Sequence, residues 1–219
     1  ALEEMVMYSK YHAGKKLTLE YVLSIFAKEL SRGRLPIIER EKQYDRGVKV
    51  VTRLFEMTKG MFLTNDKVEV DMKHEGVHIG EAHIIGKLDF LREADDSYEV
   101  IDFKTGKGFS SWDEAKTDVD KIKLHKYRQQ LIVYKLLLEN STSYNKLPVS
   151  KLSLWFVEEE KPTELVLDVN DIEVERTKKL IEAVYKKIVN LELVLDLSKY
   201  GETYKGLLEF ENDLIEGVI

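Results

Sequence analysis

The sequence contains no cysteine. A disulfide, a thiolate nucleophile and an iron–sulfur cluster are therefore excluded for this chain, because each needs cysteine sulfur. No apolar run approaches the roughly 18–20 residues that a membrane-spanning helix requires, and no signal-peptide pattern is found at the N-terminus. These absences favour a cytoplasmic protein.

An excess of positive charge is also missing. Lysine and arginine number 34 against 40 acidic residues, which gives a net charge of −6. This balance argues against a protein covered all over by nucleic acid, because phosphate binding relies on clustered basic residues. It is compatible with a local basic groove, and with carboxylates gathered around a bound cation. The 219 residues, 43% hydrophobic and 34% charged, indicate one large soluble domain or a domain with an appendage.

Hydrophobic spacing predicts helices first and strands later. Apolar residues three and four apart predict helices over 1–12, 18–30 and 38–57, with Thr18 as the N-cap of the second helix. Strands are predicted over 67–74, 77–92, 98–105, 151–159 and 163–169, and further helices over 119–140 and 171–191. The pattern of the residues from Ser198 onward is ambiguous, and a frayed helix is one interpretation of it. This order predicts an α/β fold in which helices flank a mixed central sheet.

One hairpin would bring two aspartates together. If the turn in "LREADDSYEV" is a two-residue loop at Asp95–Asp96, residue i pairs with residue 191 − i, which places Asp89 opposite Asp102. Their Cβ atoms would then be about 4.5–5.5 Å apart. Carboxylates this close repel each other unless a proton or a cation lies between them, and oxygen ligands of this kind suit Mg²⁺ or Mn²⁺.

Lys104 shares the strand face of Asp102, because side chains alternate along a strand and Ile101 and Phe103 take the other face. In a catalytic site its ammonium would polarise a nucleophilic water or stabilise developing negative charge. Alternatively, Asp89, Asp102 and Lys104 form an ordinary charged surface of a hairpin. The spacing alone leaves both interpretations open.

The following helix carries a mixed stripe. Tyr127, Gln130, Leu131 and Tyr134 fall on one face by helical spacing. A glutamine in such a stripe is partly buried, so its amide needs hydrogen-bond partners. The alternative is that the tyrosines belong to the core and Gln130 only satisfies a loop carbonyl.

The same region holds the densest group of basic residues, with Trp112 in the preceding loop. Its members are Lys104, Lys107, Lys116, Lys121, Lys123, Lys126 and Arg128. Phosphate contact is one use of such a group, and a solvated helix face is a commoner one. Interleaved acidic residues weaken the pattern.

Three short motifs in these segments resemble those of the PD-(D/E)XK nuclease superfamily, in particular its RecB-like branch. That branch has GxxD, then (D/E)xK often written out as DFKTG, then QxxxY. Here they occur in order at 86–89, 102–106 and 130–134, on a strand, a strand and a helix, and the match spans about Glu69 to Tyr134. The preceding helical region is similar to the lead-in of nuclease domains at the C-termini of UvrD- or RecB-type helicases.

The resemblance implies a restriction-endonuclease-like core over 63–195, an N-terminal helical part over 1–62 and a C-terminal tail over 196–219. It implies that Asp89 and Asp102 bind Mg²⁺ or Mn²⁺, with the Phe103 backbone carbonyl as a further ligand, and that Lys104 is the catalytic lysine.

The supporting residues follow from the same resemblance and from the basic group. Gln130 and Tyr134 would support the site or contact the DNA backbone, and Lys107, Lys126 and Arg128 would add phosphate contacts.

Two features depart from the family pattern. Its members usually carry a metal-binding histidine in an N-terminal helix, in a pattern like H-x-x-L-E. The opening "ALEEM" resembles the residues after that histidine, so we expect it before Ala1; His12, about three turns further along the predicted helix, is a poor substitute. Relatives with an iron–sulfur cluster end in cysteines, which this chain lacks.

The implied reaction is metal-assisted hydrolysis of a DNA phosphodiester by an activated water, leaving a 5′-phosphate. The implied context is an exonuclease domain of a helicase–nuclease in DNA repair or recombination, acting on single strands or ends. No GxxxxGK[ST] phosphate loop is found in the sequence, so the motor would lie elsewhere in the full-length chain or on a partner subunit. The alternative is a catalytically inactive nuclease-like module that binds DNA or a protein.

Overall fold

Three helices open the fold. In the computed structural model they are α1 (Leu2–Tyr11), α2 (Leu19–Arg32) and α3 (Ile37–Thr58), which confirms the three predicted helices. The N-cap prediction is also confirmed, because the Thr18 hydroxyl accepts a hydrogen bond from the Tyr21 backbone N–H at 3.3 Å. A small core of Met5, Val22, Val51 and Phe55 holds the three helices together. The structure describes residues 2–11, 17–58, 61–63, 65–159, 163–192, 194 and 196–219, so His12 lies outside the described residues.

A five-stranded mixed sheet forms the centre of the molecule. Its strands are β1 (Lys67–Asp71), β4 (Lys87–Ala94), β5 (Ser97–Lys104), β6 (Val149–Phe156) and β7 (Thr163–Val166), in that spatial order. Neighbours pair antiparallel except β5 and β6, which are parallel. A parallel pair needs a long crossover, and α4 (Asp118–Glu139) supplies it. The predicted mixed sheet flanked by helices is confirmed.

The prediction of one strand over 77–92 is wrong. Within that range, β2 (His78–Ile79) and β3 (Ala82–His83) form a separate two-stranded hairpin, and β4 begins only at Lys87. Gly80 has φ +56°, a conformation that glycine adopts without a steric cost, and this allows the tight turn. The hairpin packs against α5 (Asp171–Val189).

The C-terminal segment, whose sequence pattern is ambiguous, contains a capped helix rather than a frayed one. Helix α6 (Tyr204–Glu216) begins at the N-cap Thr203 and ends at Gly217 in the left-handed conformation. Leu214 is buried, and α6 contacts both α5 and α4. Tertiary packing stabilises this helix, which local sequence periodicity did not reveal.

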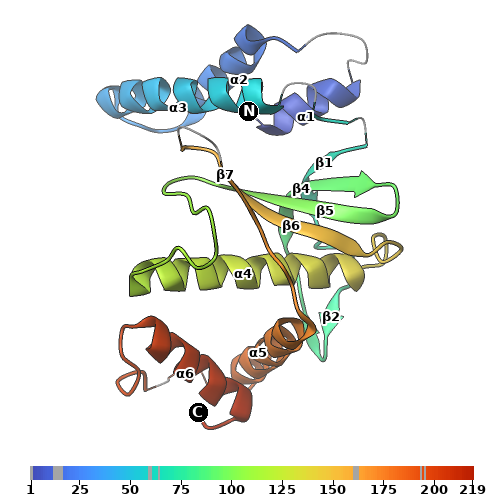
Figure 1. The fold of residues 1–219 in the computed structure, drawn as a ribbon, viewed down its shortest axis with the longest axis vertical. Coiled ribbons are helices and arrows are strands. Elements are labelled where there is room, and N and C mark those ends of the chain that lie inside the picture. Colours follow the sequence, from blue (N-terminus) through green and yellow to red (C-terminus); the bar gives the residue numbers. More distant parts are fainter. Residues whose placement is uncertain are drawn as a thin grey trace.

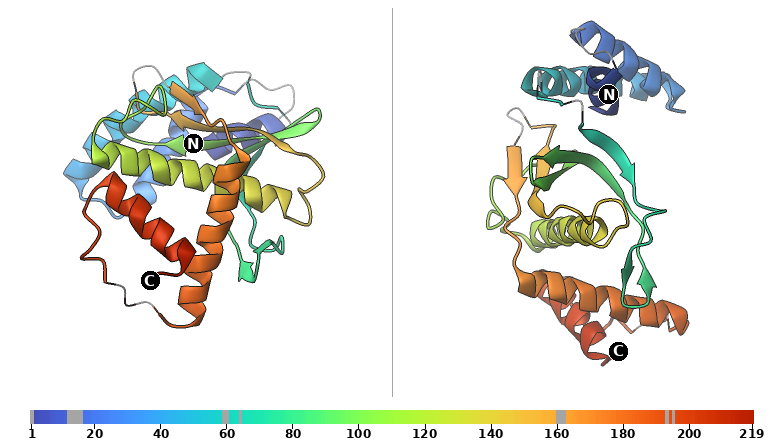
Figure 2. Two further views of the ribbon diagram at one scale, coloured as in Figure 1. Left: turned by 60° about the horizontal axis from the view of Figure 1, so that its bottom comes forward. Right: turned by 90° about the vertical axis from the view of Figure 1, so that its right-hand side faces the viewer.

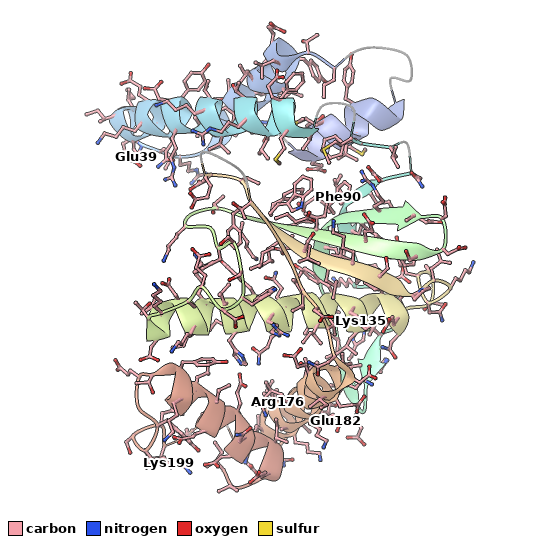
Figure 3. The ribbon with its side chains drawn as sticks, viewed as in Figure 1. Glu39, Phe90, Lys135, Arg176, Glu182 and Lys199 are labelled. Atoms are coloured by element: carbon pink, nitrogen blue, oxygen red, sulfur yellow. The ribbon has the colours of Figure 1, made fainter. Side chains whose placement is uncertain are left out.

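The elements stack in layers (Figure 1): the N-terminal helices above the sheet, α4 below it, and α5 with α6 below α4. The right-hand view of Figure 2 shows the same order of layers. Phe90, labelled in Figure 3, lies between the sheet and the N-terminal helices, where it packs with Val6 and Ile101. The opposite face of the sheet packs on α4 through Val100 and Leu131 among others. Of the described helices, none is long and apolar enough to cross a membrane.

Candidate active site

The hairpin of β4 and β5 has the predicted register. Phe90 pairs with Ile101, and the pairing continues to Ala94 and Ser97 around a two-residue turn. Just beyond the last paired residues, the Phe103 backbone N–H donates a hydrogen bond of 3.0 Å to Oδ2 of Asp89. The N–H and C=O groups of one strand residue point to the same edge, so the Phe103 carbonyl also lies on the Asp89 side.

The alternation of faces along β4 breaks at Asp89. Leu88 and Leu91 both belong to the core next to α4, whereas Phe90 belongs to the core on the other face. The register of β1 and β4 sets Glu69 opposite Asp89, and Glu69 has φ +52°. Left-handed backbone is uncommon outside glycine and clusters at functional sites. The irregular backbone at Glu69 thus lies opposite Asp89, one of the two carboxylates predicted to bind a cation.

The environment of Asp89 disfavours its negative charge. Partial burial raises the pKa of this carboxyl above its ordinary value, and the charges of Asp102 and Glu69 raise it further. The hydrogen bond from Phe103 and the charge of Lys104 oppose that rise without cancelling it. A cation bound beside Asp89 would relieve this repulsion.

Asp102 is almost fully buried, with 1% of its surface exposed. Its Oδ1 accepts hydrogen bonds from the Tyr134 hydroxyl and from Nε2 of Gln130, each 3.0 Å long. The Lys104 ammonium lies 2.5 Å from Oδ2. This ion contact lacks hydrogen-bond geometry, and within the described part of the chain Oδ2 accepts no hydrogen bond. One oxygen of a buried carboxylate is therefore left for a further positive ligand.

The amide of Gln130 joins the residues of the site. Its Oε1 accepts a 2.7 Å hydrogen bond from Lys104, while its Nε2 donates to Asp102 and, at 2.7 Å, to the Tyr134 hydroxyl. An ammonium can only donate and a carboxylate can only accept, so both ends of the amide are needed. The alternative that Gln130 merely satisfies a loop carbonyl is therefore wrong.

Two tyrosines of α4 line this network. Burial, followed by the charge of Asp102, raises the pKa of Tyr134, so its hydroxyl stays protonated as a donor. The Tyr127 ring lies 4.5 Å from Nζ of Lys104, within cation–π range. Sequence spacing placed Tyr127 on the right face but did not reveal its contact with the lysine. Its position one turn before Gln130 was the available signal.

The predicted phosphate-contacting residues are not all near this network. Lys107 is exposed and pairs with Asp120 at 2.9 Å, and Lys126 is exposed on α4 one turn before Gln130. Arg128 lies on the other side of α4, where Glu173 accepts its Nε hydrogen bond at 2.7 Å. The structure thus separates Arg128 from the lysines.

A cavity of about 610 Å³ opens on that other side of α4, between α4, α5 and α6. Its walls include Trp112, His125 and Arg128 together with Arg176 of α5, which is labelled in Figure 3. Arg128 is bonded to Glu173 and Arg176 to Glu211. The cavity is therefore distinct from the Asp89–Asp102 site, and its arginines already have anionic partners.

The residues present fit a divalent cation of the kind that prefers oxygen. Asp89 and Asp102 supply two carboxylates, and the Phe103 carbonyl lies on the same side. No group of three His, Cys, Asp or Glu residues able to hold a metal occurs in the described ranges. A site with two carboxylates suits Mg²⁺, which usually keeps several of its waters, better than Zn²⁺, which prefers a closed set of protein ligands.

Comparison with known proteins agrees with this geometry. The family model of the PD-(D/E)XK nuclease superfamily matches residues 10–200. No curated protein matches the chain. The five-stranded mixed sheet with helices on both faces is consistent with the restriction-endonuclease-like α/β fold of that superfamily. On the match over most of its length, the chain belongs to the PD-(D/E)XK nuclease superfamily.

Proposed function

We propose that this chain is a divalent-metal-dependent deoxyribonuclease domain. The observation that carries the proposal is the network in which one glutamine holds Lys104 and Asp102 together, with Asp89 beside them. The superfamily consists mainly of nucleases that use divalent cations, and the three motifs of this chain meet where β4 begins and β5 ends, next to α4.

In this proposal Asp89, Asp102 and the Phe103 carbonyl hold Mg²⁺ or Mn²⁺. The bound cation would act as a Lewis acid on the phosphate and lower the pKa of a nucleophilic water. The burial of Asp102 and the raised pKa of Asp89 support this role, because both carboxylates gain from a neighbouring positive charge.

Lys104 carries a positive charge to the same place and is proposed to stabilise the negative charge that develops on the phosphate. Its position is fixed on three sides, by Asp102, by Gln130 and by the ring of Tyr127. Gln130 and Tyr134 are positioning residues here, since both act through Asp102 or Lys104.

The finer function rests on the resemblance to the RecB-like branch. We infer an exonuclease domain of a helicase–nuclease in DNA repair or recombination, with single strands or DNA ends as substrate and a motor elsewhere. The product would carry a 5′-phosphate. A catalytically inactive module is the competing proposal, and an intact Asp89, Asp102, Lys104, Gln130 and Tyr134 disfavour it.

Cleavage of labelled single- and double-stranded DNA with Mg²⁺ or Mn²⁺ tests the proposal. The assay compares this chain, a version extended upstream of Ala1, and Asp102→Ala and Lys104→Ala in both. We expect metal-dependent cleavage that falls by at least about 10²–10³-fold in either variant, the loss typical of removing one group that stabilises the transition state. Absence of cleavage in every form, with DNA binding unchanged by the substitutions, would support the inactive module.

A further inference from the structure

The loop that follows the candidate catalytic lysine presents two backbone N–H groups to anions. Gly106 donates a 2.9 Å hydrogen bond to Oε2 of Glu158, and Gly108 donates a 2.6 Å hydrogen bond to Oε1 of Glu159. Both carboxylates come from the segment just after β6. Backbone N–H groups gathered in a tight glycine loop are a common way to bind a phosphate or another oxyanion.

Both positions need glycine for this geometry. Gly106 has φ +92°, which side-chain-bearing residues rarely adopt. At Gly108 a Cβ atom would lie 2.9 Å from Cγ of Glu159 and 3.1 Å from Cβ of Phe156. The anion thus approaches the backbone itself, as it does in phosphate-binding loops.

Two lysine side chains lie close to the loop on the side of the candidate active site. Nζ of Lys123 donates to the Lys107 carbonyl at 3.3 Å and lies 5.7 Å from the Tyr127 ring. Nζ of Lys104 lies 4.5 Å from the same ring. Lys104 directly precedes the loop in the chain and Lys123 contacts the loop at Lys107, so two cations lie close to it, where a polyanion would be attracted.

Resting on the proposed function, we propose that the N–H groups of Gly106 and Gly108 bind a backbone phosphate of the DNA next to the one that is cleaved. In the free protein Glu158 and Glu159 occupy these groups in place of the phosphate. The two glutamates are thus internal competitors of the substrate.

The exchange requires only side-chain movement. Oε2 of Glu158 is also bound by Arg46 of α3, so this carboxylate keeps a partner after it leaves Gly106. The backbone carbonyls of Glu158 and Glu159 accept hydrogen bonds from Arg53, of 3.1 Å and 2.9 Å, which anchor the segment. The Glu158 side chain is 19% exposed and can turn toward solvent. Arg46 of α3 therefore keeps the Glu158 carboxylate as its partner after the DNA has displaced that carboxylate from Gly106.

The test measures binding of a fluorescein-labelled thymidine oligonucleotide by anisotropy, in EDTA so that no cleavage occurs. The Glu158→Gln/Glu159→Gln variant keeps the shape of both side chains but loses the charge that competes with phosphate. We expect its affinity to rise about fivefold over wild type for each exchanged glutamate, the difference between a charge-assisted and a neutral hydrogen bond. The matched control is Glu175→Gln/Glu209→Gln, which makes the same change in net charge on exposed positions of α5 and α6.

A second measurement needs no variant. The amide resonances of Gly106 and Gly108 in the ¹⁵N-labelled wild-type chain should shift when the oligonucleotide is added. Equal affinity gains in the glutamate variant and in the control, or unmoved glycine amides while DNA binds, would overturn the loop proposal and leave the cleavage assay to decide the enzyme. Absence of DNA binding by every form would overturn the loop proposal and weaken the proposed function together.

Discussion

Two buried carboxylates lie on opposite sides of α4, and they differ in how far their charge is satisfied. Asp102 of β5 lies on the sheet side of α4 and is 1% exposed, whereas Glu211 of α6 lies on the other side and is 5% exposed. Adjacent residues of α4 reach them, Gln129 bonding Glu211 and Gln130 bonding Asp102. Neighbouring positions of one helix thus serve two buried acids, because successive helical residues point in different directions.

The partners of Glu211 are complete. Its oxygens lie 2.9 and 3.1 Å from Nε2 of His125 and accept hydrogen bonds from Gln129 and Arg176. Burial alone would raise the pKa of Glu211, but these three partners together lower it. The result is a structural link between α4, α5 and α6.

The surroundings of Asp102 are incomplete by comparison. Among the described residues, its Oδ2 has only the ion contact with Lys104, and the pKa of neighbouring Asp89 is raised by burial and by the charge of Asp102. A fully bonded buried carboxylate holds elements together, whereas an under-bonded pair of carboxylates is suited to bind a cation. We therefore expect a loss of charge to cost more stability at Glu211 than at Asp102, on the other side of α4.

The largest expected difference concerns stability. Glu211→Gln should lower the free energy of unfolding by about 3 kcal/mol, because it leaves Arg176 without its buried anion. Asp102→Asn should cost less, because the loss of its ion contact with Lys104 is offset in part by the removal of repulsion with Asp89. Thermal and urea unfolding of both variants measure this. Glu209→Ala, on the exposed side of α6, is the control and should stay within about 0.5 kcal/mol of wild type. Equal losses of unfolding free energy in Glu211→Gln and Asp102→Asn would contradict the claim that Glu211 is more fully bonded than Asp102.

A smaller effect of the opposite sign is expected at Asp89. Its folded pKa is raised, so its contribution to stability is lost as pH rises through that value, and the ionised group is destabilising at neutral pH. Asp89→Asn should therefore raise Tm in EDTA by about 2–4 °C, the shift that about 1 kcal/mol gives in a chain of this size. Differential scanning fluorimetry checks this. A lower Tm for Asp89→Asn would mean that Asp89 stabilises the fold without a cation.

The smallest effect is a pH dependence. The folded pKa of Glu211 lies below its ordinary value of 4.5, so its contribution is present above that value and is lost as pH falls through the folded pKa. The stability gap between wild type and Glu211→Gln should narrow below about pH 4.5. Urea unfolding at several pH values measures the gap. A gap that stays constant down to the lowest pH would show that the charge of Glu211 does not matter.

Local sequence patterns predicted one side of this comparison well. The two-residue turn fixed the register that sets Asp89 beside β5, and helical spacing put Gln130 and Tyr134 on the face that meets Asp102. Both features depend on the geometry of a single turn or a single helix, so the spacing of residues along the sequence is enough to predict them.

The other features depend on contacts between distant segments. Glu211 meets His125 across 86 positions, and Glu158 meets Gly106 across 52. The left-handed backbone at Glu69 belongs to a residue that usually avoids it, so its sequence gives no signal. Tertiary packing determines these two contacts and the Glu69 backbone, and a local pattern of residue types carries no information about that packing.

Binding of Mn²⁺ without DNA tests directly whether Asp102 belongs to a metal site. Isothermal titration calorimetry would measure Mn²⁺ binding by wild type, Asp102→Asn and Glu211→Gln. The two variants each lose one negative charge, on opposite sides of α4. We expect Asp102→Asn to abolish Mn²⁺ binding and Glu211→Gln to bind Mn²⁺ like wild type as long as it is folded. Binding that survives in Asp102→Asn, or that both substitutions weaken equally, would contradict the assignment of Asp102 to a metal site.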